Sequence, residues 1–422
     1  MSIYYTIGLL IVITTLFAYL NERVLKLPST IGIMVVALIC SVALLSTGKI
    51  FPHLFDQVTT FVAHIDLAEL VLDVMLSFLL FAGAIHFRIT DLRKERGAIM
   101  LFSTLSVVIS TVIVGVLMYY LFIWFRYPVP ITECFLFGAL ISPTDPIAVL
   151  SVLKKAKVPK SLETKIAGES LFNDAVAVLL FVVLMQIARG DRSNLSFSSV
   201  SIMLTRETLG GIGTGLLLGG IASYAIKGID NYKLEVMITL AVVMGGSVVA
   251  GLLHVSSPLA MVTCGLIIGN YGKYFAMSTQ SKDYLDKFWE MLDEILNAIL
   301  FLLMGFELLL IPKIGYYLQI GFFVVLIMLL ARYVSIFIPA KLVIFRQKLT
   351  NSTILILVWG GLRGGVSIAL ALSIDPDMHQ RVFLSLTYIV VIFSILVQGL
   401  TISKLTNNLI GSKRKKNKIL AK

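Results

Sequence analysis

The sequence is poor in charge and in cysteine. Only 14% of its 422 residues are Asp, Glu, Lys or Arg, whereas average proteins contain about 25%. The three cysteines lie inside apolar runs with no metal-ligand spacing, so we interpret them as small core side chains. Walker A, HExxH and paired CxxC sequences are absent, which leaves ATP hydrolysis and zinc chemistry without support. These absences argue against a soluble fold, against an enzyme and against a bound cofactor.

Long apolar runs take the place of charge, and 58% of the residues are hydrophobic. Thirteen runs are long enough to cross a hydrocarbon core about 30 Å thick. They cover residues 3–20, 29–47, 67–87, 97–125, 131–153, 164–188, 207–226, 234–252, 257–272, 288–311, 315–340, 352–373 and 382–403. The first run lacks a basic leader and a cleavage site, so we interpret it as a retained span. The sequence therefore predicts an all-α polytopic membrane protein with about 13 transmembrane helices.

Lysine and arginine are unevenly distributed among the loops. Loops after odd-numbered runs, together with the C-terminal tail, carry 26 of them, and the loops on the other side carry 7. Because basic residues favour the cytoplasmic side, the sequence predicts an inner-membrane protein with its N-terminus outside and its C-terminus in the cytoplasm. The net charge of +11 follows from this asymmetry and indicates contact with anionic lipid rather than with nucleic acid.

An odd number of spans permits two inverted six-helix repeats joined by a linking span, which is a common plan of secondary transporters. The fifth run is interrupted by Pro143 and Pro146, and the twelfth by four glycines between residues 360 and 365. The twelfth run is the fifth of the second half, so the interruptions match. Glycine also serves close helix packing in membranes, but the paired positions favour broken helices 5 and 12.

Three carboxylates lie in two consecutive apolar runs: Asp145 in the fifth, and Glu169 and Asp174 in the sixth. An ionisable side chain at bilayer depth costs at least about 2.5–3.5 kcal/mol, so it is rarely kept without a function. The prolines free backbone carbonyls beside Thr144, and Ser170 shares a helix face with Asp174. These hard oxygens suit a small monovalent cation, although each acid could also have an architectural role.

The sequence thus predicts one ion and proton site, in which Asn173 braces the broken helix. The predicted ion- and proton-binding residues are Asp174, Asp145, Thr144, Ser170, Asn173 and Glu169, and the predicted Na⁺ ligands are Asp174, Asp145, Thr144 and Ser170. Arg332 and Arg363 also lie inside apolar runs, and a buried guanidinium needs a carboxylate partner. Glu169 is the best candidate for that partner, and we expect it to pair with Arg332 rather than with Arg363.

Four stretches carry a resemblance to a known family. They are Ile141-Ser-Pro-Thr-Asp-Pro-Ile-Ala-Val149, Gly168-Glu-Ser-Leu-Phe-Asn-Asp-Ala175, Trp359-Gly-Gly-Leu-Arg-Gly-Gly-Val366 and Phe78-Leu-Leu-Phe-Ala-Gly-Ala-Ile-His86. Their order and spacing resemble the monovalent cation–proton antiporter family, and in particular its bacterial NhaP-type sodium/proton branch. The likeness covers residues 1–405. It departs at Ala82, where many relatives have an acid, and in the short tail, which leaves no regulatory domain.

The resemblance implies a homodimer in which a mobile six-helix core moves the site by an elevator-like shift. It assigns residues 1–90 and 229–312 to the dimerisation domain, 91–190 and 313–405 to the core transport domain, 191–228 to a linker span and 406–422 to a basic cytoplasmic tail. It also implies that Asp174 is the ion-binding aspartate, preceded by Asn173. Thr144 and Asp145 match the pair on the unwound helix, Glu169 and Arg332 the buried ion pair, and Arg363 the arginine of the second broken helix.

We therefore expect a secondary active transporter that exchanges Na⁺ (or Li⁺) for H⁺ by alternating access of a buried carboxylate site. Asn173 stands where a second acid would be needed and an arginine neutralises Glu169, so the predicted exchange is electroneutral at 1:1. Asp145 could add a second titrating group. The alternatives are K⁺/H⁺ antiport and a passive cation channel that uses the same acids as a filter. Glu307, near the outer end of the tenth run, is interpreted as a snorkelling or interfacial group.

Overall fold

The computed structural model describes residues 3–48, 50–145, 160–190, 197–311, 314–342 and 350–409. Within these ranges the regular elements are helices, apart from an isolated bridge between Asp145 and Leu362. Nine of the described helices are long and apolar enough to cross a membrane. The chain is therefore an all-helical membrane protein. Pro146, the rest of the fifth run and residues 410–422 lie outside the described residues.

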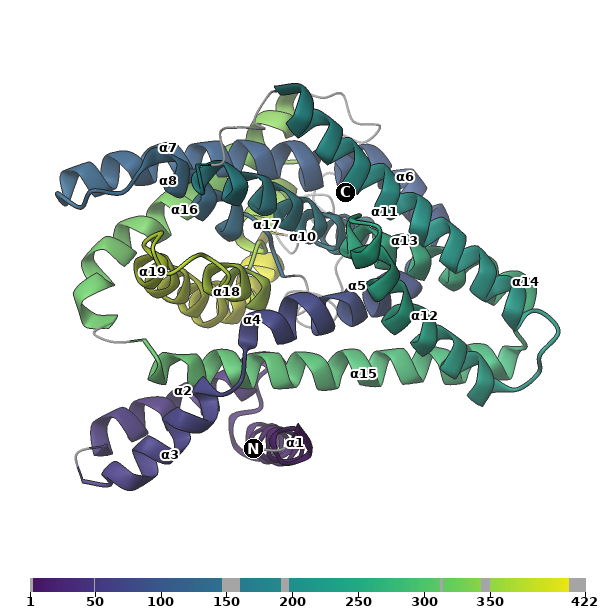
Figure 1. Ribbon diagram of the computed structural model, residues 1–422, viewed down its shortest axis with the longest axis horizontal. Helices are drawn as coiled ribbons and strands as arrows, with labels where there is room; N and C mark the ends of the chain where they lie inside the picture. Colours follow the sequence, from purple (N-terminus) through teal and green to yellow (C-terminus); the bar gives the residue numbers. More distant parts are fainter. Residues whose placement is uncertain are drawn as a thin grey trace, which may run out of the picture.

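Figure 1 shows the helices, coloured in their order along the chain. The first half comprises α1 (Ile3–Leu20), η1 (Asn21–Leu25), α2 (Ser29–Thr47), α3 (Pro52–Ala63), α4 (Leu67–Glu69), η2 (Leu70–Met75), α5 (Leu76–Ile85), α6 (Ile89–Met100), η3 (Leu101–Leu105), α7 (Ser106–Trp124), α8 (Ile131–Ile141) and α10 (Lys160–Ala188). The second half comprises α11 (Phe197–Ile226), α12 (Tyr232–Leu252), α13 (Ser257–Ile267), η4 (Ile268–Gly272), α14 (Lys273–Ala276), α15 (Thr279–Phe306), η5 (Glu307–Leu309), α16 (Ile314–Leu342), α17 (Asn351–Trp359), α18 (Gly365–Leu372), α19 (Gln380–Phe393) and η6 (Ser394–Gly399).

Several helices begin where the sequence supplies a capping side chain. The Asn231 side chain accepts hydrogen bonds from the first amides of α12, and Ser256, Ser278 and Thr350 do the same for α13, α15 and α17. A side-chain oxygen at this position satisfies an amide that has no partner within the helix. These caps define where four of the helices in the second half begin.

Four of the predicted runs fall outside the nine long apolar helices, each for its own reason. In the fifth, α8 ends at Ile141. The ninth, α13 with η4, is short, and α15 in the tenth carries charged side chains over its first half. The twelfth is divided into α17 and α18. Helix α3 lies outside the thirteen predicted runs, and Pro52 in its first turn has the fixed backbone angle that a helix start favours.

The breaks of the two interrupted helices meet inside the molecule, at the bridge between Asp145 and Leu362. Figure 1 shows α15 running along one side, α7, α8 and α16 on the opposite side, and α10 and α17 between them. Helix α8 packs against α7 and α10, and α18 packs against α8 and α19. Two of the large buried clusters of hydrophobic side chains enclose this region, so the polar groups at the helix breaks are surrounded by apolar side chains.

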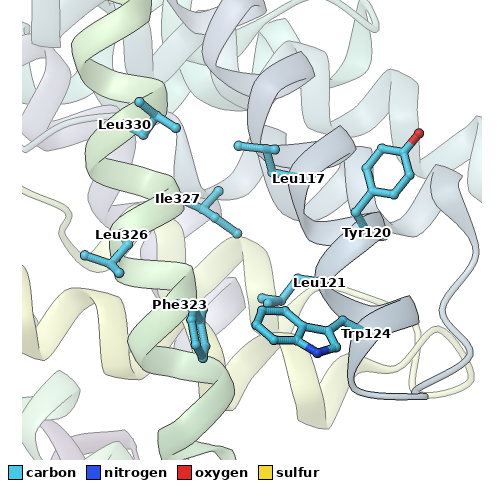
Figure 2. A pocket seen from close by; sticks show the side chains of 8 residues that line it. All are labelled: Leu117, Tyr120, Leu121, Trp124, Phe323, Leu326, Ile327 and Leu330. Atoms are coloured by element: carbon cyan, nitrogen blue, oxygen red, sulfur yellow. The ribbon is translucent and has the colours of Figure 1, made fainter.

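An open apolar groove of about 290 Å³ lies between α7 and α16 (Figure 2). Its lining residues are Leu117, Tyr120, Leu121, Trp124, Phe323, Leu326, Ile327 and Leu330. Trp124 and Tyr120 are exposed on the outer surface of the helices. A cation needs oxygen ligands, and hydrophobic and aromatic side chains line this groove, so it does not suit an ion.

Candidate ion site

The first helix break begins where α8 ends at Ile141, and residues 142–145 continue as irregular chain. Proline at position 143 cannot donate a backbone hydrogen bond, so the helix cannot continue through it unchanged. Ser142 donates back to the carbonyl oxygen of Gly138 over 2.6 Å, which closes the last turn. The predicted break is therefore observed on its N-terminal side.

Helix α10 holds this break through Asn173 and Ser170. The Asn173 Nδ2 donates to Thr144 Oγ1 over 2.7 Å, and the Thr144 amide donates to Asn173 Oδ1 over 3.4 Å. The Ser170 hydroxyl donates to the carbonyl oxygen of Thr144. All three side chains are buried. Asn173 thus takes the bracing position that the sequence suggested.

The second break lies between the end of α17 at Trp359 and the start of α18 at Gly365. The Asp145 amide donates to the Leu362 carbonyl oxygen over 2.8 Å, so the two breaks cross at these residues. A Cβ atom on Gly364 would lie 2.5 Å from Asp145 Oδ2. The Asp145 carboxylate therefore lies against the first residues of α18, where unpaired amides favour negative charge.

Arg363 binds the end of the opposite broken helix. Its Nη1 donates to the Ser142 and Pro143 carbonyl oxygens, over 2.7 Å in the case of Pro143. The side chain is 1% exposed. A cation at a helix C-terminus complements the negative end of the helix dipole. Arg363 thus occupies carbonyls that the break leaves free, and it is not the ion-pair partner of Glu169.

Glu169 and Arg332 form a buried ion pair. Arg332 Nη1 lies 2.6 Å from Glu169 Oε1, and Nη2 donates to the Leu357 carbonyl oxygen over 3.2 Å. A Cβ atom on Gly361 would lie 2.5 Å from Arg332 Nε. The guanidinium of Arg332, on α16, therefore contacts α10 and α17. It lies so close to the second break that a side chain at position 361 would collide with it. The pairing with Arg332 is the one that the sequence favoured.

Asp174 differs from Asp145 and Glu169, the other two acids of this site. Within the described parts of the chain, no hydrogen bond or ion pair of the Asp174 side chain is found. It follows Asn173 on α10 and is partly exposed. It lies within electrostatic reach of Asp145 and Arg363. The predicted ligands Thr144, Ser170 and Asp145 thus meet at the helix crossing, and Asp174 follows directly on the helix that braces it.

Two residues of this region were missed from the sequence. Ser394 and Gln398, both fully buried, contact the second break from η6. Their only sequence signal is that they are polar, four residues apart, in an apolar run. The interpretation of Glu307 as a snorkelling group is wrong, because it is 4% exposed and packed at the end of α15. No group of His, Cys, Asp and Glu suited to a resident metal is found among the described residues.

Comparison with known proteins supports the resemblance read from the motifs. The family profile described as sodium/hydrogen exchanger, transmembrane, matches residues 11–408. The Na⁺/H⁺ antiporter NhaP of Pseudomonas aeruginosa is 46% identical over 406 residues, which are 94% of this chain and 95% of that protein. The Na⁺/H⁺ antiporter NhaH of Halobacillus dabanensis is 31% identical, over 92% and 93% of the two chains.

A solved structure has the same fold. The sodium proton antiporter MjNhaP1 from Methanocaldococcus jannaschii superposes with a TM-score of 0.74, over 97% of this chain and 98% of that one. The two sequences are 22% identical. At this identity the likeness establishes the fold alone.

Proposed function

We propose that this chain, which belongs to the sodium/hydrogen exchanger family, is a secondary active transporter that exchanges Na⁺ (or Li⁺) for H⁺. The observation that carries the proposal is the position of Asp174. It is a partly exposed carboxylate without a partner among the described residues, next to a crossing of two broken membrane helices. Such a crossing at the midplane is where secondary transporters bind their ions.

The Na⁺ ligands in this proposal are oxygens of Asp174, Asp145, Thr144 and Ser170. Ser170 donates to the Thr144 carbonyl oxygen and Asn173 donates to the Thr144 hydroxyl, and these bonds hold Thr144 and Ser170 in place. A proton and a Na⁺ compete for Asp174, so binding of one releases the other. Glu169 takes no part in this competition, since Arg332 neutralises it. One carboxylate that carries either one H⁺ or one Na⁺ gives 1:1 electroneutral exchange.

The wider architecture is proposed with the boundaries given by the sequence. Thirteen spans form two inverted six-helix repeats, with the N-terminus outside and the C-terminus in the cytoplasm of the inner membrane. Spans 1–3 and 8–10 form the dimerisation domain of a homodimer, and spans 4–6 and 11–13 form the core that moves. Contacts of α7 with α8 and α16, and of α18 with α8 and α19, support one core unit.

The experiment is Na⁺ uptake into proteoliposomes that are acidic inside and have equal Na⁺ on both sides. An antiporter uses the outward flow of H⁺ to accumulate radioactive Na⁺ above the outside concentration. Radioactive Na⁺ that enters until it equals the outside concentration, without exceeding it, would mean a passive channel instead. A second measurement identifies the cation: Na⁺, Li⁺ or K⁺ is added to the vesicles in turn, and the collapse of the pH gradient is followed. If only K⁺ collapses the gradient, the transported cation is K⁺ and not Na⁺.

A further inference from the structure

A π-helical turn in the last long helix holds the second break. Ser394, the first residue of η6, accepts a hydrogen bond from the Arg363 amide over 2.9 Å. The same hydroxyl donates to Gln398 Oε1 over 2.8 Å, and Gln398 Nε2 donates to the Trp359 carbonyl oxygen over 3.3 Å. The two side chains therefore bind both ends of the break, the last residue of α17 and the arginine before α18.

The packing around these two side chains leaves little freedom. Ser394 and Gln398 are each 0% exposed, so water cannot replace the hydrogen bonds they make. Gly399 ends the π-turn, and a Cβ atom there would lie 3.6 Å from Leu362 Cδ1, in the middle of the break. Single π-turns in membrane helices are frequent at functional sites. Here the turn brings its polar residues against the broken chain.

The arrangement repeats what α10 does for the first break. Asn173 and Ser170 on α10 bind Thr144, and Ser394 and Gln398 on η6 bind Arg363 and Trp359. In both halves of the chain, polar side chains of the helix that follows a break hold that break. The halves differ in what comes next, because Asp174 follows Asn173 whereas the apolar Ile395 follows Ser394. Ser394 and Gln398, which we call the second clamp, thus hold the second break without placing a carboxylate beside it.

The second clamp is connected to the proposed ion ligands through Arg363. Ser394 holds the Arg363 backbone, and the Arg363 side chain binds the carbonyl oxygens of Ser142 and Pro143, directly before Thr144. The Asp145 amide is bound to the neighbouring Leu362. A shift of the second break therefore moves the guanidinium and the bridge that together locate Thr144 and Asp145.

We propose that Ser394 and Gln398 are positioning residues of the ion site and determine its affinity for Na⁺ through Arg363. This rests on the proposed Na⁺ ligands. The variants that test it are Ser394→Ala, Gln398→Met and the conservative Ser394→Thr. The matched control is Ser385→Ala, because Ser385 is equally buried on α19 but donates only to the Arg381 carbonyl of its own helix.

Two readouts are needed: the KM and maximal rate for Na⁺ in proteoliposomes, and the rise of the melting temperature with Na⁺ concentration in detergent, which reports binding without transport. We expect Ser394→Ala and Gln398→Met to weaken Na⁺ binding and raise KM roughly tenfold, the scale of one lost buried hydrogen bond. The maximal rate should change less than KM. Ser394→Thr should remain near the parent protein, and Ser385→Ala should lower the melting temperature without changing Na⁺ affinity.

Unchanged Na⁺ affinity in both Ser394→Ala and Gln398→Met would overturn the positioning role and leave these residues as structural. Failure of the proposed function looks different, because the unmodified protein would then bind or exchange no Na⁺ at all. If Ser394→Ala does not fold, Gln398→Met alone decides, since it keeps the side-chain volume and removes only the contact to Trp359 and Ser394.

Discussion

The charged side chains around the helix crossing differ in what they bind. Glu169 and Arg332 neutralise each other, and Arg363 binds backbone carbonyls at the end of α8. Asp174 is the carboxylate for which no partner is found in the described parts of the chain. A group already held in one charge state cannot cycle between a proton and a cation. This difference supports the proposed exchange at Asp174 and a structural role for the two arginines.

The Glu169–Arg332 pair predicts strong coupling between its members. Removing either charge leaves the other buried and unpaired, at a cost of about 3–5 kcal/mol. Glu169→Gln and Arg332→Ala should each lower thermal stability, and the double variant should cost less than the sum of the two. Melting temperatures of the four proteins in one detergent test this. Strict additivity would contradict the 2.6 Å contact.

Gly364 predicts a steric effect at the ion site. A Cβ atom there would lie 2.5 Å from Asp145 Oδ2, and the backbone on both sides is held at the crossing. Gly364→Ala should therefore displace Asp145 and lower Na⁺-dependent exchange at least tenfold. Gly245→Ala on α12 is the control, because nothing lies within 4 Å of its Cβ position. Equal activity of both variants in proteoliposomes would count against a role for Asp145.

At the scale of helices, the sequence predicted both breaks and the role of Asn173 at the first, but not how the second break is held. Prolines and clustered glycines interrupt an apolar run visibly, so the fifth and twelfth spans could be recognised. The partners of Arg363 are backbone carbonyls, which have no sequence signature. A π-turn such as η6 leaves composition unchanged, so Ser394 resembled any polar residue in a membrane helix. Helix α3 lies outside the predicted runs because its twelve residues are too few to cross a membrane.

An ion pair joins the end of α10 to the loop after α18. Arg189 Nε and Nη2 donate to the Asp375 carboxylate over 2.7 and 2.8 Å, and these bonds lower the pKa of Asp375. Because the pKa of Asp375 is lower in the folded protein than in the unfolded chain, the pair contributes its full stability at pH values above the unfolded pKa, which is near 4. This contribution is lost as the pH falls through the lower pKa of the folded protein. Asp375→Asn should cost at most about 1 kcal/mol at pH 7, since the pair is exposed. The difference in melting temperature between the two proteins should vanish in strong acid, and a difference that grows there would contradict this.

At the scale of the whole molecule, the sequence predicted the family and the all-helical membrane fold, and both are confirmed. Hydropathy reveals the fold because membrane-spanning helices must be apolar, and the motifs reveal the family because they contain the polar residues of the ion site. The sequence does not reveal a dimer interface directly, since lipid-facing and partner-facing helix surfaces are both apolar. The proposed homodimer and orientation therefore rest on the family and on the distribution of basic residues.

Stoichiometry is a property of the whole transport cycle. One carboxylate that carries one H⁺ or one Na⁺ moves no net charge, whereas two protons per Na⁺ would move one charge, worth about 2.3 kcal/mol per 100 mV. We expect the rate and the end-point of Na⁺ uptake to be independent of membrane potential. Proteoliposomes held at different potentials with valinomycin and K⁺ test this. A dependence on voltage would mean that Asp145 titrates together with Asp174.

The most direct test of the account replaces Asp174 by asparagine. Asp174→Asn keeps the shape and removes the one carboxylate that is assigned to exchange Na⁺ for H⁺. In proteoliposomes acidic inside, we expect the parent protein to accumulate Na⁺ and the variant to show no uptake above empty vesicles. The two proteins should elute alike on size exclusion and melt cooperatively. Na⁺ accumulation by a well-folded Asp174→Asn variant would contradict the assignment of exchange to this residue.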